Sequence, residues 1–276
     1  GTLLNKEKKK EFSTRNYRKQ ERLRANFSSD AKGNLLSKEE AYRNRLKLDW
    51  KKENIAIPSF LGLKQIVGLP IEEIRPYIDW TFFFKAWQMR GSYPRIMNDP
   101  LKGKIANELF TNANKMLDEI IEKKLLQANV AYGFWPANAD NDDIILYKNE
   151  KRTDELVRFN MLRQRRIKSG YTLSLSDFIA PKDSSIKDYI GAFAVTAGIK
   201  AEKLSADYEK NNDDYKSIMV KTLADRLAEA LAELMHQRVR KEWGFPDDKG
   251  MTNDDLIKEK YRGIRPAFGY PACPNH

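Results

Sequence analysis

Hydrophobic positions recur with helical spacing in two long stretches of the chain. Between residues 103 and 125 the apolar residues fall three or four positions apart, which predicts an amphipathic helix. Residues 214–243 repeat this pattern over a greater length. The expected core stripe of this second helix is Ile218, Leu223, Leu227, Leu231 and Leu234. A short helix is also expected after Pro70, and a last one from about Asn253 to before Gly263.

Short apolar runs rich in β-branched and aromatic residues predict strands between these helices. Residues 129–138 and 142–147 are such runs, and the polar residues where they meet favour a hairpin. Further strands are expected at 155–159, 173–181 and 188–198, and a short exposed helix is expected at 161–168, before Gly170. Short groups of antiparallel-looking strands among long helices predict an α+β domain rather than regular βαβ alternation.

The first 52 residues differ from the rest because apolar positions are sparse. Residues 4–25 lack Pro and Gly and are rich in Lys, Arg, Glu and Gln, which predicts a solvated helix or an arm that lies on another surface. A break is expected at 28–34, and Ser37-Lys-Glu-Glu resembles a capping box that starts a second polar helix. Residues 53–62 should be extended, since Pro58 forbids a helix there. We therefore divide the chain into a basic helical arm, residues 1–52, and a domain, residues 53–276.

The distribution of charge supports the same division. The chain has 50 Lys and Arg against 39 Asp and Glu, and residues 1–52 contribute nine of the formal +11 charges. A nucleic-acid-binding module would place exposed aromatic residues beside its basic ones. Here the aromatic residues cluster in the nearly neutral remainder instead. The sequence therefore predicts no nucleic-acid partner.

Composition and motifs exclude several other classes. One Cys permits neither an internal disulfide nor a cysteine zinc cage, and with two His no metal site is expected. No apolar run approaches the roughly 20 residues of a membrane span, so we expect a cytoplasmic protein without a membrane partner. Dinucleotide, P-loop and hydrolase motifs are missing, and no catalytic residue is assigned. Cys273 is expected to pack structurally, and His236 to stabilise a helix C-terminus.

An aromatic-rich segment, residues 77–94, contains one carboxylate. Helical spacing places four of its aromatic residues on one face, which indicates core packing. These residues are Trp80, Phe83, Phe84 and Trp87. Asp79 lies inside this apolar run, where a carboxylate should either cap a helix or face a ligand. The sequence leaves both roles open.

Two other features could recognise a small polar ligand. Asp225, Glu229 and Glu233 recur every fourth residue and so stack on one helix face, as a solvated stripe or as an acidic wall. In the tail, residues 262–276, prolines and a glycine fix the backbone path. Fixed backbone groups suit a flat heterocycle, and Arg265 could pair with a carboxylate or phosphate. A packed structural loop with Arg265 in an ordinary salt bridge is the alternative.

Five segments together resemble the C-terminal activation domain of cobalamin-dependent methionine synthase, in the order and approximate spacing of that family. They are YIDWTFFFKAW (77–87), PAN (136–138), DYIGAFAV (188–195), LADRLAEALAE (223–233) and RGIRPAFGYPACPNH (262–276). The resemblance covers roughly residues 35–276. It implies a single C-shaped α+β domain, with a twisted antiparallel sheet flanked by long helices, after a helical N-terminal arm. It also implies an AdoMet-binding (S-adenosylmethionine-binding) module that reactivates oxidised cobalamin within a methyltransferase.

The resemblance also implies the residues that contact AdoMet. Asp79 matches an AdoMet-contacting Asp of the family, and Glu229 matches a carboxylate that lines the same shallow groove. Four tail residues fall on the family's R-x-A-x-G-Y positions, which hold AdoMet through side-chain and backbone contacts. These are Arg265, Ala267, Gly269 and Tyr270.

Partners follow from what the resemblance includes and omits. The D-x-H-x-x-G motif that binds cobalamin is missing, so cobalamin would be held by a partner module, and a flavodoxin-like or equivalent reductase would supply the electron. The basic arm would connect to the cobalamin module and could dock an acidic electron-transfer protein. The family's domain normally continues beyond the tail motif, which implies a weaker AdoMet affinity for residues 1–276 alone. The alternative is an interaction domain that docks on the cobalamin module but has lost AdoMet binding.

Overall fold

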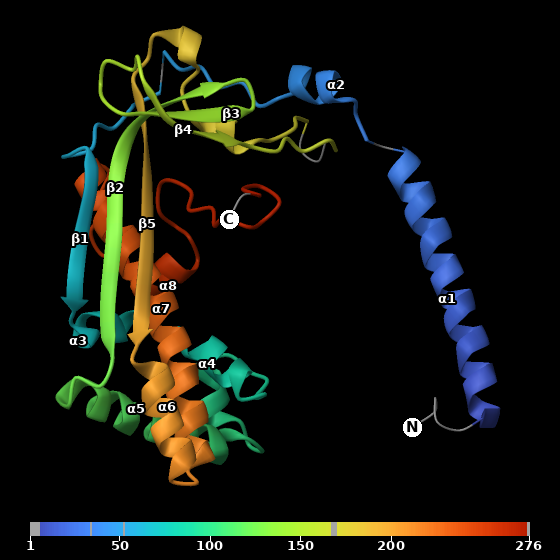
Figure 1. Cartoon of the computed structure of the whole chain (residues 1–276), viewed down its shortest axis with the longest axis vertical. Helices are drawn as coiled ribbons and strands as arrows, with labels where there is room; N and C mark the ends of the chain where they lie inside the picture. The colour runs from blue at the N-terminus through green and yellow to red at the C-terminus, as the bar shows by residue number, and fades with distance from the viewer. Residues whose placement is uncertain (1–5, 34, 52, 167–169, 275–276) are drawn as a thin grey trace.

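A five-stranded antiparallel sheet forms the centre of the computed structural model, which describes residues 6–33, 35–51, 53–166 and 170–274. The strands are β1 (Gly62–Leu69), β2 (Gln127–Asp140), β3 (Asp143–Tyr147), β4 (Glu155–Asn160) and β5 (Asp188–Ile199). β2 is shared: residues 127–137 pair with β5, residues 128–134 pair with β1 on the opposite edge, and residues 137–140 pair with β3. Figure 1 shows the three long strands side by side, with β3 and β4 at one end. The predicted α+β fold with an antiparallel sheet is confirmed.

β1 and β2 approach each other closely at one point. A side chain at Gly133 of β2 would collide with the carbonyl oxygen of Gly62 on β1 and with the ring of Trp135. The close approach therefore requires glycine at position 133, which is typical of close backbone approach in sheets. Gly62 has room for a side chain, but its left-handed φ of 89° favours glycine there.

The longest helix, α7 (Asp214–Trp243), packs against β5 and carries much of the core. It begins where the Asp213 carboxylate accepts a hydrogen bond from the Lys216 amide (3.0 Å), and it ends at Gly244, which has a left-handed φ of 96°. Four of the five predicted core leucines and isoleucines are buried, but Ile218 is 51% exposed. Met219 and Val220 face the core in its place, because the buried face begins one residue later than the pattern indicated.

A second long helix, α5 (Gly103–Glu122), confirms the predicted amphipathic helix. The shorter helices are α3 (Ile71–Ile74), η1 (Arg75–Tyr77), α4 (Trp80–Ala86), η2 (Arg95–Asn98), α6 (Ala201–Lys210) and α8 (Asn253–Ile257). Phe83 and Phe84 of α4 are fully buried, and Trp80 and Trp87 pack against the same core. The aromatic face of this segment is therefore core packing, as expected from its spacing.

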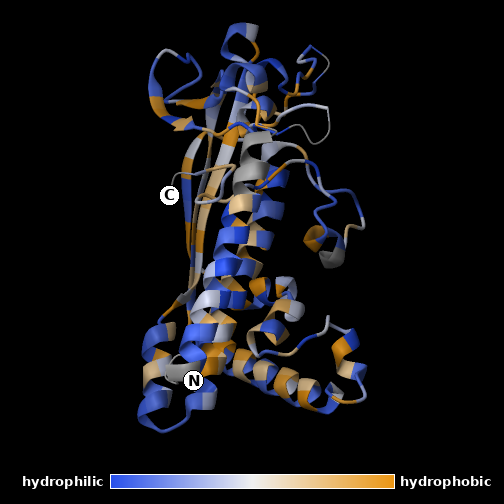
Figure 2. Cartoon of the chain, turned by 90° about the vertical axis from the view of Figure 1, so that its right-hand side faces the viewer, coloured by the Kyte–Doolittle hydropathy of each residue, from blue (hydrophilic) through white to orange (hydrophobic). Residues whose placement is uncertain are grey.

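The N-terminal region forms α1 (Lys6–Gly33) and α2 (Lys38–Arg43). The expected break at 28–34 is wrong for residues 28–33, because α1 continues to Gly33. Ser and Asp lower helix stability only modestly, and Ala favours a helix. α1 stands apart from the sheet in Figure 1, and hydrophilic residues dominate it in Figure 2. The predicted capping box is confirmed, with Ser37 and Glu40 each accepting from the other's amide. Among the described residues, no helix combines the length and apolar character that crossing a bilayer requires.

Residues 161–181 differ from the prediction in two places. The helix expected at 161–168 is missing from residues 161–166, which are irregular, while residues 167 and 168 lie outside the described part. The strand expected at 173–181 is instead η3 (Leu175–Phe178). Ser174 and Asp177 form a capping box there, and this local hydrogen bonding favours a helical turn over an extended strand. η4 (Lys182–Ser184) follows directly.

The chain has a second, smaller hydrophobic core beyond the main one. It contains the buried residues Ala137, Ile144, Leu146, Met161 and Cys273. Cys273 comes from the C-terminal tail, and burial raises the pKa of its thiol. Its role is therefore structural, as predicted, and it anchors the end of the tail against the sheet.

Candidate functional site

Asp79 lies at the junction of η1 and α4 and caps the latter helix. Its Oδ1 accepts a hydrogen bond from the Thr81 amide at 2.8 Å. Within the described residues, no group donates to its Oδ2. The capping role is thus confirmed, and the same carboxylate keeps one oxygen available on a partly exposed surface.

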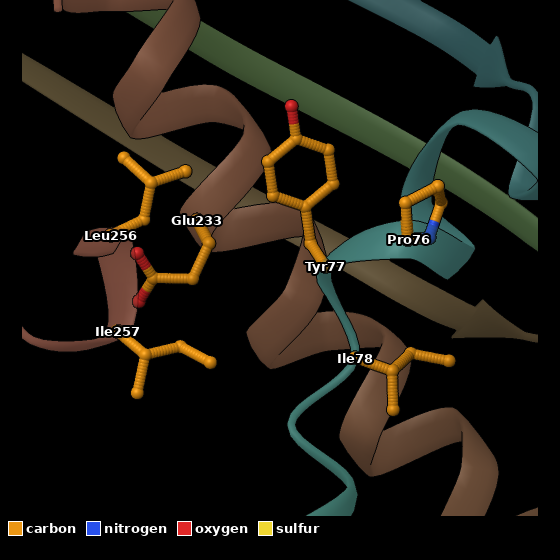
Figure 3. Close-up of a pocket in the computed structure, with 6 residues that line it drawn as sticks. All are labelled: Pro76, Tyr77, Ile78, Glu233, Leu256 and Ile257. Carbon is orange, nitrogen blue, oxygen red and sulfur yellow. The ribbon is translucent and has the colours of Figure 1, made fainter. Parts of the chain in front are cut away.

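A small pocket separates this junction from α7. Pro76, Tyr77 and Ile78 line one side, and Glu233 lines the other together with Leu256 and Ile257 of α8 (Figure 3). Its volume of about 20 Å³ holds roughly one water molecule. The pocket places the chain next to Asp79 directly opposite the turn of α7 that carries Glu233.

The three acidic residues of α7 have different environments. Asp225 is exposed and pairs with the neighbouring Arg226. Glu229 is also exposed, and it forms no ion pair with any residue in the described ranges. Glu233 is mostly buried and pairs with Arg265. The stripe is therefore solvated at one end and in contact with the tail at the other.

The tail crosses α7 at Arg265 and then turns sharply. Gly269, with φ 87°, donates its amide to the Cys273 carbonyl (2.8 Å), and Cys273 donates to the Tyr270 carbonyl (2.9 Å). Ala267 is exposed, and the Tyr270 residue is 67% exposed. Tyr270 and Cys273 also form an isolated antiparallel bridge. The tail thus presents partly exposed Arg265 and an exposed stretch of backbone at Ala267.

His236 does not stabilise a helix C-terminus, as the sequence had suggested. It lies two turns before the end of α7 and is buried, with its ring edge against Tyr261 at a centroid distance of 4.7 Å. Burial, with the charges of Arg240 and Arg265, lowers the pKa of His236 to about 3, so the ring is neutral at physiological pH. The prediction failed because the chain folds back after Gly244 and covers this turn, which no local pattern reveals.

A larger cavity lies elsewhere, between residues 42–50 and the end of β2. It measures about 610 Å³ and includes Tyr42, Trp50 and Lys182 in its lining. None of the predicted site residues lines it. Two of its three carboxylates already form ion pairs, Asp140 with Arg158 and Asp177 with Arg163. No cluster of potential metal ligands was found among the residues described.

Two of the predicted site segments meet α7 at Glu233. The residues just before Asp79 line a pocket with Glu233, and Arg265 of the tail pairs with the same carboxylate. This arrangement offers carboxylates, one guanidinium and exposed tail backbone. It suits a ligand with both an amino-acid moiety and a flat ring.

Comparison with known proteins shows the family of the chain. Residues 70–276 match the family described as vitamin B12 dependent methionine synthase, activation domain. The chain is also similar to the solved MetH reactivation domain bound to AdoHcy (S-adenosylhomocysteine), with 45% sequence identity and a TM-score of 0.84, covering 87% of this chain and 74% of that one. All six predicted site residues fall within the matched range. The chain therefore belongs to the family of vitamin B12-dependent methionine synthase activation domains.

Proposed function

We propose that this chain binds AdoMet between Asp79, the acidic face of α7 and the tail, and presents the methyl group to cobalamin held by a partner module. The observation that carries the proposal is the meeting of Arg265 with Glu233 beside the unpaired Glu229. The similar reactivation domain was solved with AdoHcy, which is AdoMet without its methyl group. The same surface would therefore receive the same adenosyl and amino-acid groups.

The residues present fit the chemistry of the ligand. Arg265 uses only Nη2 to pair with Glu233 among the described residues, so its other N–H groups can hold a carboxylate. Glu229 and the free oxygen of Asp79 can receive an ammonium and compensate a sulfonium. The exposed backbone at Ala267 and Tyr270 can bond an adenine edge.

The contribution of the chain is to bind and orient its ligand. AdoMet, when bound, supplies an electrophilic methyl group for transfer to reduced cobalamin. Because methyl transfer to such a nucleophile moves no proton, the site needs no general base, and we expect none of its carboxylates to act as one. Asp79 and Glu229 would hold the positive end of the ligand, while Arg265 would fix its carboxylate. We do not expect this chain alone to catalyse methyl transfer.

Two partners complete the proposal. A cobalamin-binding module would close over the exposed methyl, and a flavodoxin-like or equivalent reductase would provide the electron. The exposed cations of α1, including Lys9, Arg18 and Arg22, offer a positive surface to an acidic electron-transfer protein.

Isothermal titration of the chain with AdoHcy, and separately with AdoMet, tests the proposal. We expect saturable 1:1 binding for both ligands, and weaker binding for adenosine or methionine alone because each engages half of the site. Absence of heat at millimolar ligand would reject the proposal. That result would favour an interaction domain that docks on the cobalamin module without AdoMet.

Substitution of Asp79 separates its capping role from its ligand role. Asn is as good an N-cap as Asp, so Asp79→Asn should leave the free energy of unfolding nearly unchanged and yet weaken AdoMet binding through loss of charge. Asp79→Ala should weaken binding similarly and also destabilise the fold by about 1 kcal/mol. Urea denaturation and calorimetric titration of both variants measure the two effects. Unchanged affinity in Asp79→Asn would restrict Asp79 to capping.

A further inference from the structure

A buried ion pair closes the turn that follows α7. Beyond Gly244 the chain reverses, and Asp247 returns to Arg240: Oδ1 accepts from Nε at 2.6 Å and Oδ2 accepts from Nη2 at 2.7 Å. The Arg240 side chain is 2% exposed, and hydrogen bonds from Arg240 lower the pKa of the Asp247 carboxyl. The pair is thus two-pronged, charged and shielded from water. A bidentate pair of this kind fixes the relative position of its two side chains, because either charge would be costly to bury without the other.

From Asp247 a chain of hydrogen bonds reaches the Asp79 side of the proposed site. Gln237 donates from Nε2 to Asp247 Oδ2 at 3.2 Å, and its Oε1 accepts from the Tyr77 hydroxyl at 2.6 Å. Tyr77 ends η1, two residues before Asp79, and lines the pocket opposite Glu233. The position of the junction that carries Asp79 therefore depends on Gln237 and Asp247.

From Arg240 a second chain of contacts reaches the tail. The Arg240 guanidinium lies over the Tyr261 ring at 4.1 Å, and the Tyr261 ring also meets His236. Tyr261 is four residues before Arg265, which pairs with Glu233 one turn along α7 from Gln237. Because its pKa is lowered to about 3, His236 carries no charge that would repel Arg240 or Arg265. The same ion pair thus supports both sides of the site.

We propose that Asp247 is a positioning residue, which with Arg240 and Gln237 sets the separation between Asp79 and Arg265 across α7. Asp247 lies behind the ligand surface and acts through Tyr77 on one side and Tyr261 on the other. The inference rests on the proposed function, since it concerns the geometry of the AdoMet site.

The test is AdoHcy titration of the whole chain carrying Asp247→Asn, with Asp248→Asn as the matched control. Asp247→Asn keeps the side-chain volume but removes the charge that binds Arg240. It should raise the dissociation constant about 3- to 30-fold, the range usual for residues that act through a network. Asp248 is exposed, and within the described residues its side chain has no partner, so Asp248→Asn should change affinity less than about 2-fold. Titrations are run below the unfolding temperature of every variant.

A double-mutant cycle distinguishes positioning from general weakening of the fold. In an Arg265→Lys background, Asp247→Asn should raise the dissociation constant by a smaller factor than in the unmodified chain, because the part of its effect that passes through Arg265 is already lost. A fully additive loss would overturn the inference, as would unchanged affinity of Asp247→Asn when the unmodified chain binds AdoHcy. Failure of the unmodified chain to bind would instead overturn the proposed function, and the inference with it.

If Asp247→Asn fails to fold, Tyr77→Phe supplies the same test. It removes only the hydroxyl that bonds Gln237 and leaves the ring in place. A loss of affinity for AdoHcy, with an unfolding temperature close to that of the unmodified chain, supports the inference. If Tyr77→Phe and the unmodified chain bind AdoHcy with equal affinity, the inferred link from Asp247 to Asp79 is overturned.

Discussion

Replacing Arg265 with alanine is expected to weaken AdoHcy and AdoMet binding by about 10- to 100-fold, the worth of a charge-assisted bond to a carboxylate. Arg265 pairs with Glu233 through one nitrogen, and its remaining N–H groups have no partner among the described residues and could hold the ligand carboxylate. Loss of the guanidinium removes that partner and also leaves Glu233 without its counter-ion. Calorimetric titration measures the change directly.

Arg262→Ala is the matched control for this substitution. Arg262 belongs to the same tail, and its Nη2 donates to the Asn54 carbonyl at 2.7 Å, away from Glu233. Both substitutions remove one positive charge, so an effect of net charge alone would appear in both. Equal affinities of Arg265→Ala and the unmodified chain would show that Arg265 has only a structural role.

Arg163→Ala should lower the free energy of unfolding by about 3–5 kcal/mol, the range for breaking a buried ion pair from one side. The Arg163 side chain is 4% exposed and pairs with Asp177 and, at 2.8 Å, with Asp142. Asp177 also caps η3, so its charge would remain buried without a partner. Urea denaturation followed by circular dichroism measures the loss.

Arg165→Ala provides the comparison for this second substitution. Arg165 is two residues away, is exposed, and donates from Nε to the Leu36 carbonyl at 2.7 Å. We expect it to cost less than about 1 kcal/mol, as for most exposed contacts. If the two variants unfolded at the same urea concentration, the Arg163 cluster would contribute no more than a surface hydrogen bond.

Elements that bury one periodic face were predictable from the sequence. α7 has the bounds that its apolar spacing and flanking residues indicated, and the hairpin of β2 and β3 follows from two β-rich runs. The prediction of a helix cap was also confirmed where the capping residues are close in sequence, as for Ser37 and Glu40. In each case the information lies within a few residues of the element.

Failures occur where distant residues decide the structure. An exposed helix was predicted for residues 161–166 because the segment is rich in polar residues such as Arg163. In the structure the Arg163 side chain is buried in ion pairs with Asp142 and Asp177. β1 was missed because its alternation is weak and its pairing with β2 is more than 60 residues away. His236 looked like a helix-end residue until the returning chain placed Tyr261 on it.

In the candidate site, too, some features were predictable from the sequence and others depend on distant residues. The resemblance indicated which residues to expect at the ligand, and the structure brings Arg265 and the segment before Asp79 to Glu233 of α7. It could not indicate the Asp247–Arg240 pair behind them, because neither residue belongs to a motif. Support of this kind becomes visible only once the turn after Gly244 is known.

Buried residues flank the exposed part of the tail, with Leu256 of α8 before it and Cys273 in the second core after it. These two anchors restrict the paths open to the stretch around Arg265 and Tyr270. Part of its conformational entropy is therefore lost when the chain folds, before any ligand binds. A ligand meeting such a surface keeps more of its interaction energy as affinity than one that must first order a loose loop.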